Sequence, residues 1–140
     1  MAFELEEGRE ATIENLFRSL GGERCLRDDF ATKKFVDQAF DGGQLHVVLR
    51  GSPFQLKVWE GLLRIPSGVV TSYVGLAISL GRPTATRAVA SAVARNPVSW
   101  LVPCHRVLRH NGMISGYRWG PVKKRSMLAF ESAILEELAA

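Results

Sequence analysis

Two segments near the start of the chain repeat their apolar residues with the period of an amphipathic helix. In Glu10–Leu20 apolar positions recur every three or four residues, and Gly21-Gly22 ends the pattern. Thr32–Phe40 has the same period and is ended by Asp41-Gly42-Gly43. Gln44–Arg50 (QLHVVLR) then predicts a strand. One strand cannot form a sheet, so this part either packs on the remainder of the chain or is the remnant of a larger sheet domain.

After Gly51 the pattern predicts three closely spaced helices. Ser52-Pro53 has the residue types of a helix start, and Pro66-Ser67-Gly68 ends the apolar periodicity of the first helix. Thr71-Ser72 caps a second predicted helix, Tyr73–Leu80. After a Gly-Arg-Pro turn, a third runs from Thr84 to about Arg95. Two helices joined by a short turn predict a helix-turn-helix.

The last third of the chain predicts short strands and a closing helix. The apolar run Val98–Val102 predicts a buried strand. Asn111-Gly112 predicts a hairpin turn between Arg106–His110 and Met113–Tyr117. Val122–Leu138 predicts the closing helix. The expected fold class is therefore α/β with mostly α structure, in two parts: residues 1–50, with two helices and one strand, and residues 51–140.

Charge is distributed unevenly along the 140 residues. The chain is 46% hydrophobic and 23% charged, which excludes a disordered or collagen-like protein, and its net charge is +4. Residues 1–50 carry seven Lys/Arg against ten Asp/Glu, whereas residues 51–130 carry eleven against one. So basic a block is typical of a surface that binds a polyanion such as nucleic acid. The alternative is a basic surface that serves solubility alone.

Cysteine usage and the termini indicate an intracellular protein. Cys25 and Cys104 are too few for a disulfide framework, and no Cys/His spacing suits zinc. The N-terminus begins with acidic residues and shows no leader pattern. The longest charge-free stretch, Ile65–Gly81, contains one proline, three glycines and four Ser/Thr, so no membrane span is expected. We expect reduced thiols and a cytoplasmic, nucleoid-associated protein.

The third predicted helix carries unusually small side chains over most of its surface. Arg87 stands out among Ala85, Ala88, Ala90, Ser91, Ala92 and Ala94. Small residues allow close approach to another surface. That surface is either a neighbouring helix or a groove of DNA, with Arg87 inserted.

Cys104 follows a proline, precedes a histidine and is a candidate nucleophile. The thiolate is the reactive form, and His105 can take the thiol proton near neutral pH, through a water molecule if the two side chains diverge. A carboxylate that orients the imidazole completes such a relay. Glu60 and Glu131 are the candidates, and Glu131, on the closing helix, is preferred. The alternatives are an inert core cysteine and a structural histidine.

Five blocks in this order and spacing resemble the O6-alkylguanine-DNA alkyltransferases, which repair DNA by direct reversal. The signature is Pro103-Cys104-His105-Arg106-Val107. The other blocks are FQLKVWEGLLRIPSG (Phe54–Gly68), TSYVGLA (Thr71–Ala77), RAVASAVARNP (Arg87–Pro97) and GYRWG (Gly116–Gly120). The resemblance covers about residues 51–135. It implies the winged-helix-like, DNA-binding and catalytic C-terminal domain of that family, preceded here by a shortened N-terminal segment.

The resemblance implies a single-turnover transfer of the alkyl group from O6-alkylguanine, and less well from O4-alkylthymine, in duplex DNA. Cys104 would be the permanent acceptor, and His105, through water, and Glu131 would generate its thiolate. Asn96 would be the hinge between the recognition helix and the active-site segment. Tyr73 would donate to the guanine and help to rotate its phosphate.

The same resemblance implies a DNA surface and a substrate pocket. On the minor groove, Arg87 would fill the gap left by the flipped base, and Ala88 and Arg95 would lie at the DNA surface. The pocket residues would be Val93, Val107, Tyr117, Arg118 and Trp119. Lys124 would support the closing helix. No metal or cofactor is implied, and we expect a monomer that acts on double-stranded DNA and not on membranes.

Two features depart from the family pattern, and three other functions compete. Family members usually have a fuller N-terminal sheet domain, and Trp119 is bulky where some have a small residue, which predicts a preference for methyl over benzyl adducts. A non-enzymatic alkyltransferase-like protein would lack Cys104. A helix-turn-helix regulator would carry polar base-reading residues on its recognition helix. A cysteine hydrolase would leave Arg87 and the basic block unexplained.

Overall fold

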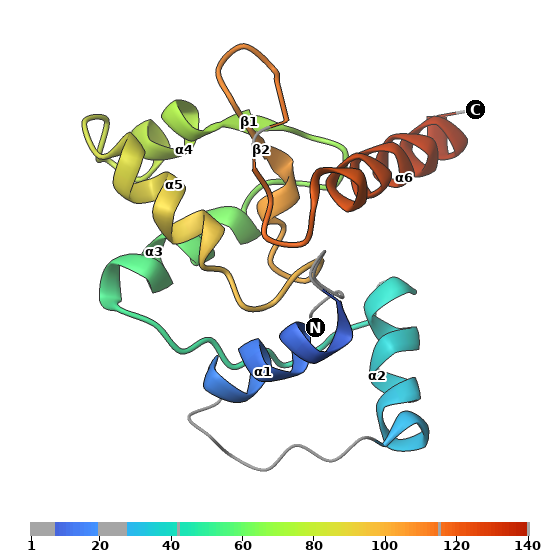
Figure 1. Ribbon diagram of the computed structural model, residues 1–140. Coiled ribbons are helices and arrows are strands. Elements are labelled where there is room, and N and C mark those ends of the chain that lie inside the picture. The colour runs from blue at the N-terminus through green and yellow to red at the C-terminus, as the bar shows by residue number, and fades with distance from the viewer. Residues whose placement is uncertain (1–7, 20–27, 42, 115, 140) are drawn as a thin grey trace.

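The computed structural model of the protein describes residues 8–19, 28–41, 43–114 and 116–139 (Figure 1). Helices dominate it, and a two-stranded parallel sheet is the only sheet among these residues. The elements in chain order are α1 (Arg9–Ser19), α2 (Asp29–Phe40), α3 (Pro53–Leu63), β1 (Thr71–Ser72), α4 (Tyr73–Ser79), α5 (Thr86–Ala94), the 3₁₀ helix η1 (Cys104–Arg106), β2 (Val107–Leu108) and α6 (Pro121–Ala139). The mostly helical class expected from the sequence is confirmed.

Local capping signals explain where most helices begin. Ser52 and Gln55 form a capping box at α3: the Ser52 hydroxyl accepts from the Gln55 amide, and the Gln55 side chain accepts from the Ser52 amide. Ser72 caps α4 by accepting from the Gly75 amide at 3.0 Å. Asp28 caps α2, which therefore begins three residues before the predicted Thr32.

The helix-turn-helix forms as predicted, with α4 and α5 as its two helices. The core-facing side of α5 packs against both α3 and α4. Trp59 of α3 lies in this core and donates its indole N–H to the Ala92 carbonyl at 2.9 Å. Helix α5 begins at Thr86, two residues after the predicted Thr84, and its N-cap residue, Ala85, makes no side-chain capping bond.

The short parallel sheet joins the helix-turn-helix to the cysteine segment. Thr71 pairs with Val107 and Ser72 with Leu108. Strand β1 leads directly into α4, and β2 comes directly after η1. The first residue of α4, Tyr73, is therefore held close to the end of the segment that carries Cys104.

Three predicted strands are absent among the described residues. Gln44–Arg50 is coil, since no described segment pairs with it. Val98–Val102 is a turn, because the Asn96 side chain forms hydrogen bonds with backbone groups of this segment that a strand would use for pairing. The Asn111-Gly112 turn exists, with Gly112 at φ 75°, but the described part of Met113–Tyr117 is not a strand. The sheet partner of β2 is instead β1.

The first fifty residues contact the rest of the chain through α2. Ala39 is the one buried residue of that helix, and its carbonyl accepts from the Trp100 indole N–H at 3.1 Å. Leu49 packs against the core from the coil that leads to α3. Leu20, Gly21-Gly22, Cys25 and Gly42 lie outside the described residues.

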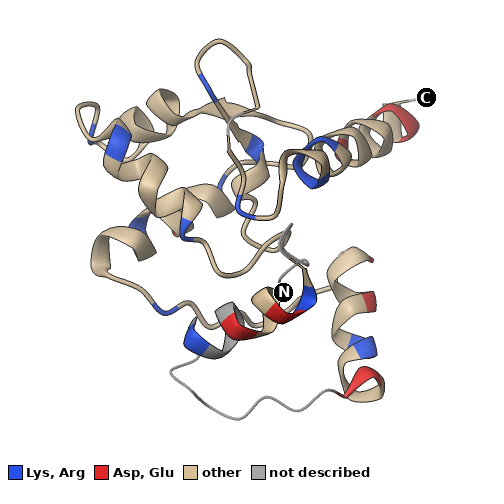
Figure 2. Ribbon diagram, viewed as in Figure 1, with Lys and Arg blue, Asp and Glu red and all other residues tan. Residues whose placement is uncertain are grey.

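Charge separates along the fold as it does along the sequence. Figure 2 shows the acidic residues mainly on α1, α2 and the end of α6, whereas basic residues also occur across the part between. None of the described helices is both long and apolar enough to cross a membrane.

Candidate active site

Cys104 begins η1 and is only 2% exposed. Asn96 Nδ2 lies 3.2 Å from its sulfur and points a donor at it. The Tyr117 hydroxyl oxygen lies 3.8 Å from the same sulfur. Burial raises the pKa of the Cys104 thiol, and the hydrogen bonds from Asn96 and Tyr117 and the charge of Lys124 act in the opposite direction. The thiol therefore needs a base to become a nucleophile.

Asn96 holds the turn that precedes Cys104. Its Nδ2 also donates to the carbonyls of Val98, at 3.1 Å, and Val102, at 2.8 Å. Its Oδ1 accepts from the Val98 amide at 3.0 Å. The side chain is fully buried at the end of α5 and so links that helix to the cysteine segment.

His105 and Glu131 form a buried pair. His105 Nε2 lies 2.8 Å from Glu131 Oε1, and both residues are at most 2% exposed. No hydrogen bond joins Cys104 and His105, which succeed one another in a 3₁₀ turn. His105 Nδ1 has no hydrogen-bond partner among the described residues. The sequence-preferred carboxylate is thus the one that contacts the histidine.

Glu131 is fixed by more than the histidine. Arg106 Nε lies 3.0 Å from Oε2 and its Nη2 lies 2.7 Å from Oε1, a two-pronged contact. The Gly68 amide donates to Oε2 at 3.0 Å. Burial raises the pKa of Glu131, but the hydrogen bonds from Arg106, Gly68 and His105 outweigh it and leave the pKa below its ordinary value. Glu131 is therefore a carboxylate at neutral pH.

The ionised Glu131 determines which nitrogen of His105 carries the proton. A carboxylate only accepts, so Nε2 is the donor and Nδ1 keeps the lone pair. Burial lowers the pKa of His105, and the charges of Arg106 and Lys124 add to this against the opposing effect of Glu131. The imidazole is therefore neutral in the resting protein and has one nitrogen free to accept a proton.

Lys124 places a buried cation close to the thiol. Its Nζ donates to the Val107 carbonyl at 2.6 Å and lies 5.5 Å from the centre of the Tyr117 ring. Burial lowers its pKa to about 8, whereas the charge of the Cys104 thiolate raises it. The ammonium and the thiolate therefore stabilise one another.

The predicted pocket residues gather around Tyr117. Its hydroxyl lies 3.0 Å from Ser99 Oγ, and its ring meets Trp119 edge-on at 5.5 Å. The Arg118 guanidinium lies 5.6 Å from the centre of the Trp119 ring. Val93, Val107 and Trp119 belong to the buried core, and Trp119 is 2% exposed. Tyr117 is therefore the residue through which Trp119 adjoins the surroundings of Cys104.

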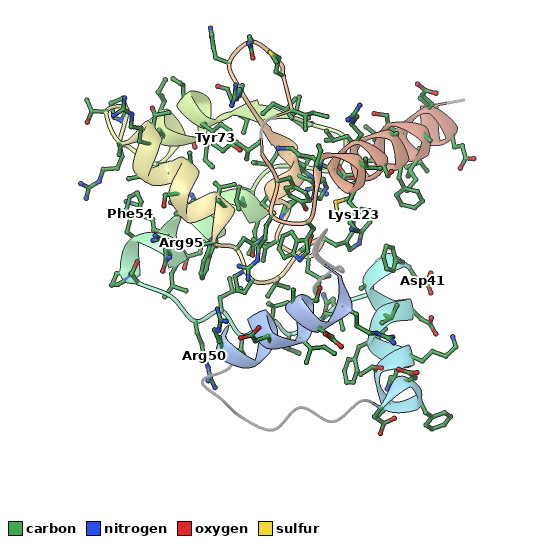
Figure 3. The ribbon with its side chains drawn as sticks, in the orientation of Figure 1. Asp41, Arg50, Phe54, Tyr73, Arg95 and Lys123 are labelled. Carbon is green, nitrogen blue, oxygen red and sulfur yellow. The ribbon has the colours of Figure 1, made fainter. Side chains whose placement is uncertain are left out.

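The predicted DNA residues lie apart from the buried site, on the outer face of the helix-turn-helix. The exposed positions of α5 lie along one helical stripe and are small except at its two ends: Arg87, Ala88, Ser91, Ala94 and Arg95. Figure 3 labels Arg95 on this helix and Tyr73 at the start of α4. Tyr73 is half-buried and packs against the core.

Three residues contribute to the site through contacts that the sequence analysis did not predict, although Arg106 and Gly68 lie in the family blocks. Arg106 adjoins His105, but its contact with Glu131 spans 25 positions. Gly68 lies in the turn after α3, and a Cβ there would collide with Leu135 of α6. Trp100 has φ 68°, in the left-handed region, and stacks on His105. Among the described residues no cluster of three or more His, Cys, Asp or Glu could hold a metal.

Comparison with known proteins places this arrangement in a family. Residues 53–133 match the family model "6-O-methylguanine DNA methyltransferase, DNA binding domain". A methylated-DNA–protein-cysteine methyltransferase of Salmonella typhimurium is 46% identical over 91 residues, which are 65% of this chain and 53% of that protein. The chain thus spans about half the length of this curated relative.

Solved structures agree. Mycobacterium tuberculosis OGT in complex with DNA is 38% identical with a TM-score of 0.67, over 73% of this chain and 65% of that one. S. pombe Atl1 in complex with damaged DNA containing O6-carboxymethylguanine is 30% identical with a TM-score of 0.52, over 60% of this chain and 80% of that one. Because the family model covers more than half of the residues, the chain belongs to the 6-O-methylguanine DNA methyltransferase family.

Proposed function

We propose that the protein repairs O6-alkylguanine in duplex DNA by moving the alkyl group irreversibly to its own Cys104. One observation carries the proposal: a buried thiol, contacted by Asn96, is followed directly by a histidine held by an ionised glutamate. The relatives that share these blocks are named methylated-DNA–protein-cysteine methyltransferases, which agrees with this chemistry.

The transfer needs one proton movement and one displacement. Nδ1 of His105 accepts the Cys104 proton through a water molecule, and Glu131 stabilises the imidazolium that forms. The thiolate then attacks the alkyl carbon in line with the bond to guanine O6. A C–S bond forms as the C–O bond breaks, and the guanine that leaves takes up a proton in place of the one lost by the thiol. No step regenerates the thiol, so each molecule reacts once.

The target atom must leave the base stack to reach the buried sulfur. Extrusion of a nucleotide costs a few kcal/mol, which contacts to the DNA must offset. We assign the minor-groove surface to the outer stripe of α5, where Ala88 and Ser91 allow close approach and Arg95 contacts phosphate. Arg87 fills the vacated stack, and Tyr73 holds the guanine and its phosphate. Phosphate contacts dominate, so binding is salt-dependent and has little sequence preference.

The proposed pocket binds the flipped guanine and limits the size of the alkyl group that it carries. Val93, Val107, Tyr117 and the Arg118 backbone surround the base, and Lys124 supports α6 against them. Trp119, packed edge-on against Tyr117, keeps the pocket small, so that methyl adducts react faster than benzyl adducts. The same site accepts O4-alkylthymine less well. We expect the protein to act as a monomer in the cytoplasm, on nucleoid DNA.

A lesion-binding protein without transfer activity is the second candidate. The similarity to S. pombe Atl1 bound to damaged DNA supports this alternative. Cys104 and its contacts with Asn96 and Tyr117 favour transfer, because a binding protein has no need of a nucleophile. A sequence-specific helix-turn-helix regulator would need polar side chains on α5, which is mostly alanine on its outer face.

One experiment separates these functions. The protein is incubated with duplex DNA containing one O6-methylguanine, and the Cys104 peptide is then weighed by mass spectrometry. We expect one added methyl group per molecule and an equal amount of restored guanine. In Cys104→Ser the methyl group is not transferred but DNA binding remains. Lesion binding with an unmodified sulfur would support the binding protein, and repeated turnover would support a hydrolase.

A further inference from the structure

Trp100 has an unusual backbone conformation beside the active site. It is the one non-glycine residue with positive φ in the part of the chain that the structure describes. Bulky side chains rarely adopt that region unless the surrounding structure imposes it, and such residues concentrate at functional sites. The conformation turns the indole onto His105: the two rings are nearly parallel, at 8°, with their centres 5.7 Å apart.

Contacts from two other helices hold the indole in this position. Its N–H donates to the Ala39 carbonyl of α2 at 3.1 Å. The Phe40 ring, also of α2, lies 5.1 Å from it, and the Phe130 ring of α6 lies 5.7 Å from it. Helix α2 therefore reaches the catalytic histidine through a single side chain.

We propose that Trp100 is a positioning residue for alkyl transfer: it holds the His105 ring by stacking, stabilises the imidazolium form, and makes both depend on α2. This inference rests on the proposed function for its biological meaning. The stacking itself is tested without DNA.

The charges around His105 explain why such a contact matters. Glu131 of α6 favours the imidazolium, whereas Arg106 of η1 and Lys124 of α6 oppose it. Arg106 also neutralises much of the Glu131 charge through its two-pronged contact. The face of the indole attracts a cation without adding a formal charge. Trp100 thus stabilises the protonated form of His105, which Arg106 and Lys124 disfavour.

The test compares Trp100→Leu and Trp100→Phe with the parent protein. The pKa of His105 is measured by NMR titration of the imidazole, and methyl transfer is measured in single-turnover reactions. In Trp100→Leu we expect proton binding by His105 to weaken about two- to thirtyfold, the range of exposed to desolvated cation–π contacts, with a matching loss of transfer rate. Trp100→Phe keeps an aromatic face and should recover most of both, although it loses the bond to Ala39.

Two control variants separate positioning from stability. Trp59→Phe also removes a hydrogen bond from an indole N–H to a backbone carbonyl, that of Ala92, but Trp59 does not stack on His105; the variant should lower stability without changing the His105 titration. Phe40→Ala should weaken His105 protonation in the same direction as Trp100→Leu, whereas Phe35→Ala, on the same helix but more exposed, should not. If Trp100→Leu does not fold, the comparison of Phe40→Ala with Phe35→Ala still tests whether contacts to the indole affect His105 protonation.

The outcomes are distinguishable. An unchanged or strengthened protonation of His105 in both Trp100→Leu and Phe40→Ala overturns the proposal. If the His105 titration shifts as expected but the parent protein transfers no methyl group, the stacking role stands and the proposed function fails.

Discussion

Asn96 and Cys104, eight residues apart, meet in the core through a 3.2 Å contact between amide nitrogen and sulfur. The same amide group holds both ends of the turn between them. The position of the sulfur is therefore tied to Asn96, which follows the C-terminal end of α5, so that a displacement of α5 would be passed to the sulfur.

Replacement of Asn96 should affect both stability and the thiol. Asn96→Ala leaves the Val98 amide without its acceptor and removes one of the two hydrogen bonds to the Val102 carbonyl, which we expect to lower the free energy of unfolding by about 2 kcal/mol. It also removes a donor to the sulfur, so the pKa of the thiol rises further. Urea unfolding and titration of Cys104 measure the two effects. Asn111→Ala, in an exposed turn, is the control and should change neither by much.

Stability should fall in two steps as the pH is lowered. The pKa of His105 is below 6.5 in the folded protein, so below pH 6.5 only the unfolded chain gains that proton and stability begins to fall. The pKa of Glu131 is below 4.5 when folded, so its contribution is complete above pH 4.5 and is lost below it. Urea unfolding from pH 8 down to about pH 2 measures both steps. In His105→Phe the upper step should be reduced; an unchanged upper step would refute its assignment.

Gly68→Ala tests the contact between the turn after α3 and α6. Gly68 has φ 72° and Gly81 has φ 70°, but a Cβ meets Leu135 only at Gly68. Gly81→Ala should therefore cost about 1 kcal/mol from the backbone alone. Gly68→Ala should cost roughly 1 kcal/mol more, as Leu135 is displaced, and should slow transfer by moving a donor of Glu131. Equal losses of stability in thermal unfolding would show that Leu135 adapts freely.

Arg87→Ala tests base extrusion. If Arg87 occupies the stack left by the flipped base, its loss should slow methyl transfer from duplex DNA by roughly tenfold or more, since extrusion costs a few kcal/mol. Transfer from a single strand that carries the same lesion should change little, because that base is already free of its partner. Single-turnover rates on the two substrates measure this. A similar loss on both would indicate that Arg87 supplies only phosphate affinity.

Lys124→Met tests the buried cation. Removal of the ammonium should raise the pKa of the Cys104 thiol and slow transfer at neutral pH, because the thiolate loses a stabilising charge. Arg125→Met, one residue on, removes the same formal charge from the exposed side of α6 and is the control. Titration of the thiol in the two variants gives the comparison, and equal shifts would mean that only net charge matters.

Local signals made much of the helical structure predictable. Ser52-Pro53 and Ser72 act within three residues of the helix that they begin, so the sequence alone locates α3 and α4. Strands need a partner elsewhere in the chain. Gln44–Arg50 has a strand pattern but no partner among the described residues. In Val98–Val102, backbone groups form hydrogen bonds with the Asn96 side chain instead of with another strand.

The site divides in the same way. Cys104 and His105 are adjacent, and Glu131 could be chosen because the basic block left few carboxylates. The contributions of Arg106, Gly68 and Trp100 could not be predicted, because each depends on a contact that spans many residues or on one backbone angle.

Glu131 lies on α6 and reaches back to Gly68, His105 and Arg106. Ribosomal synthesis delivers those three residues first and the glutamate only after them. A nascent chain that lacks α6 therefore carries a cysteine whose histidine has no carboxylate. Under the proposed function, the thiol acquires its base only once α6 has been made and has docked, so products truncated before this helix should not transfer a methyl group from DNA to Cys104.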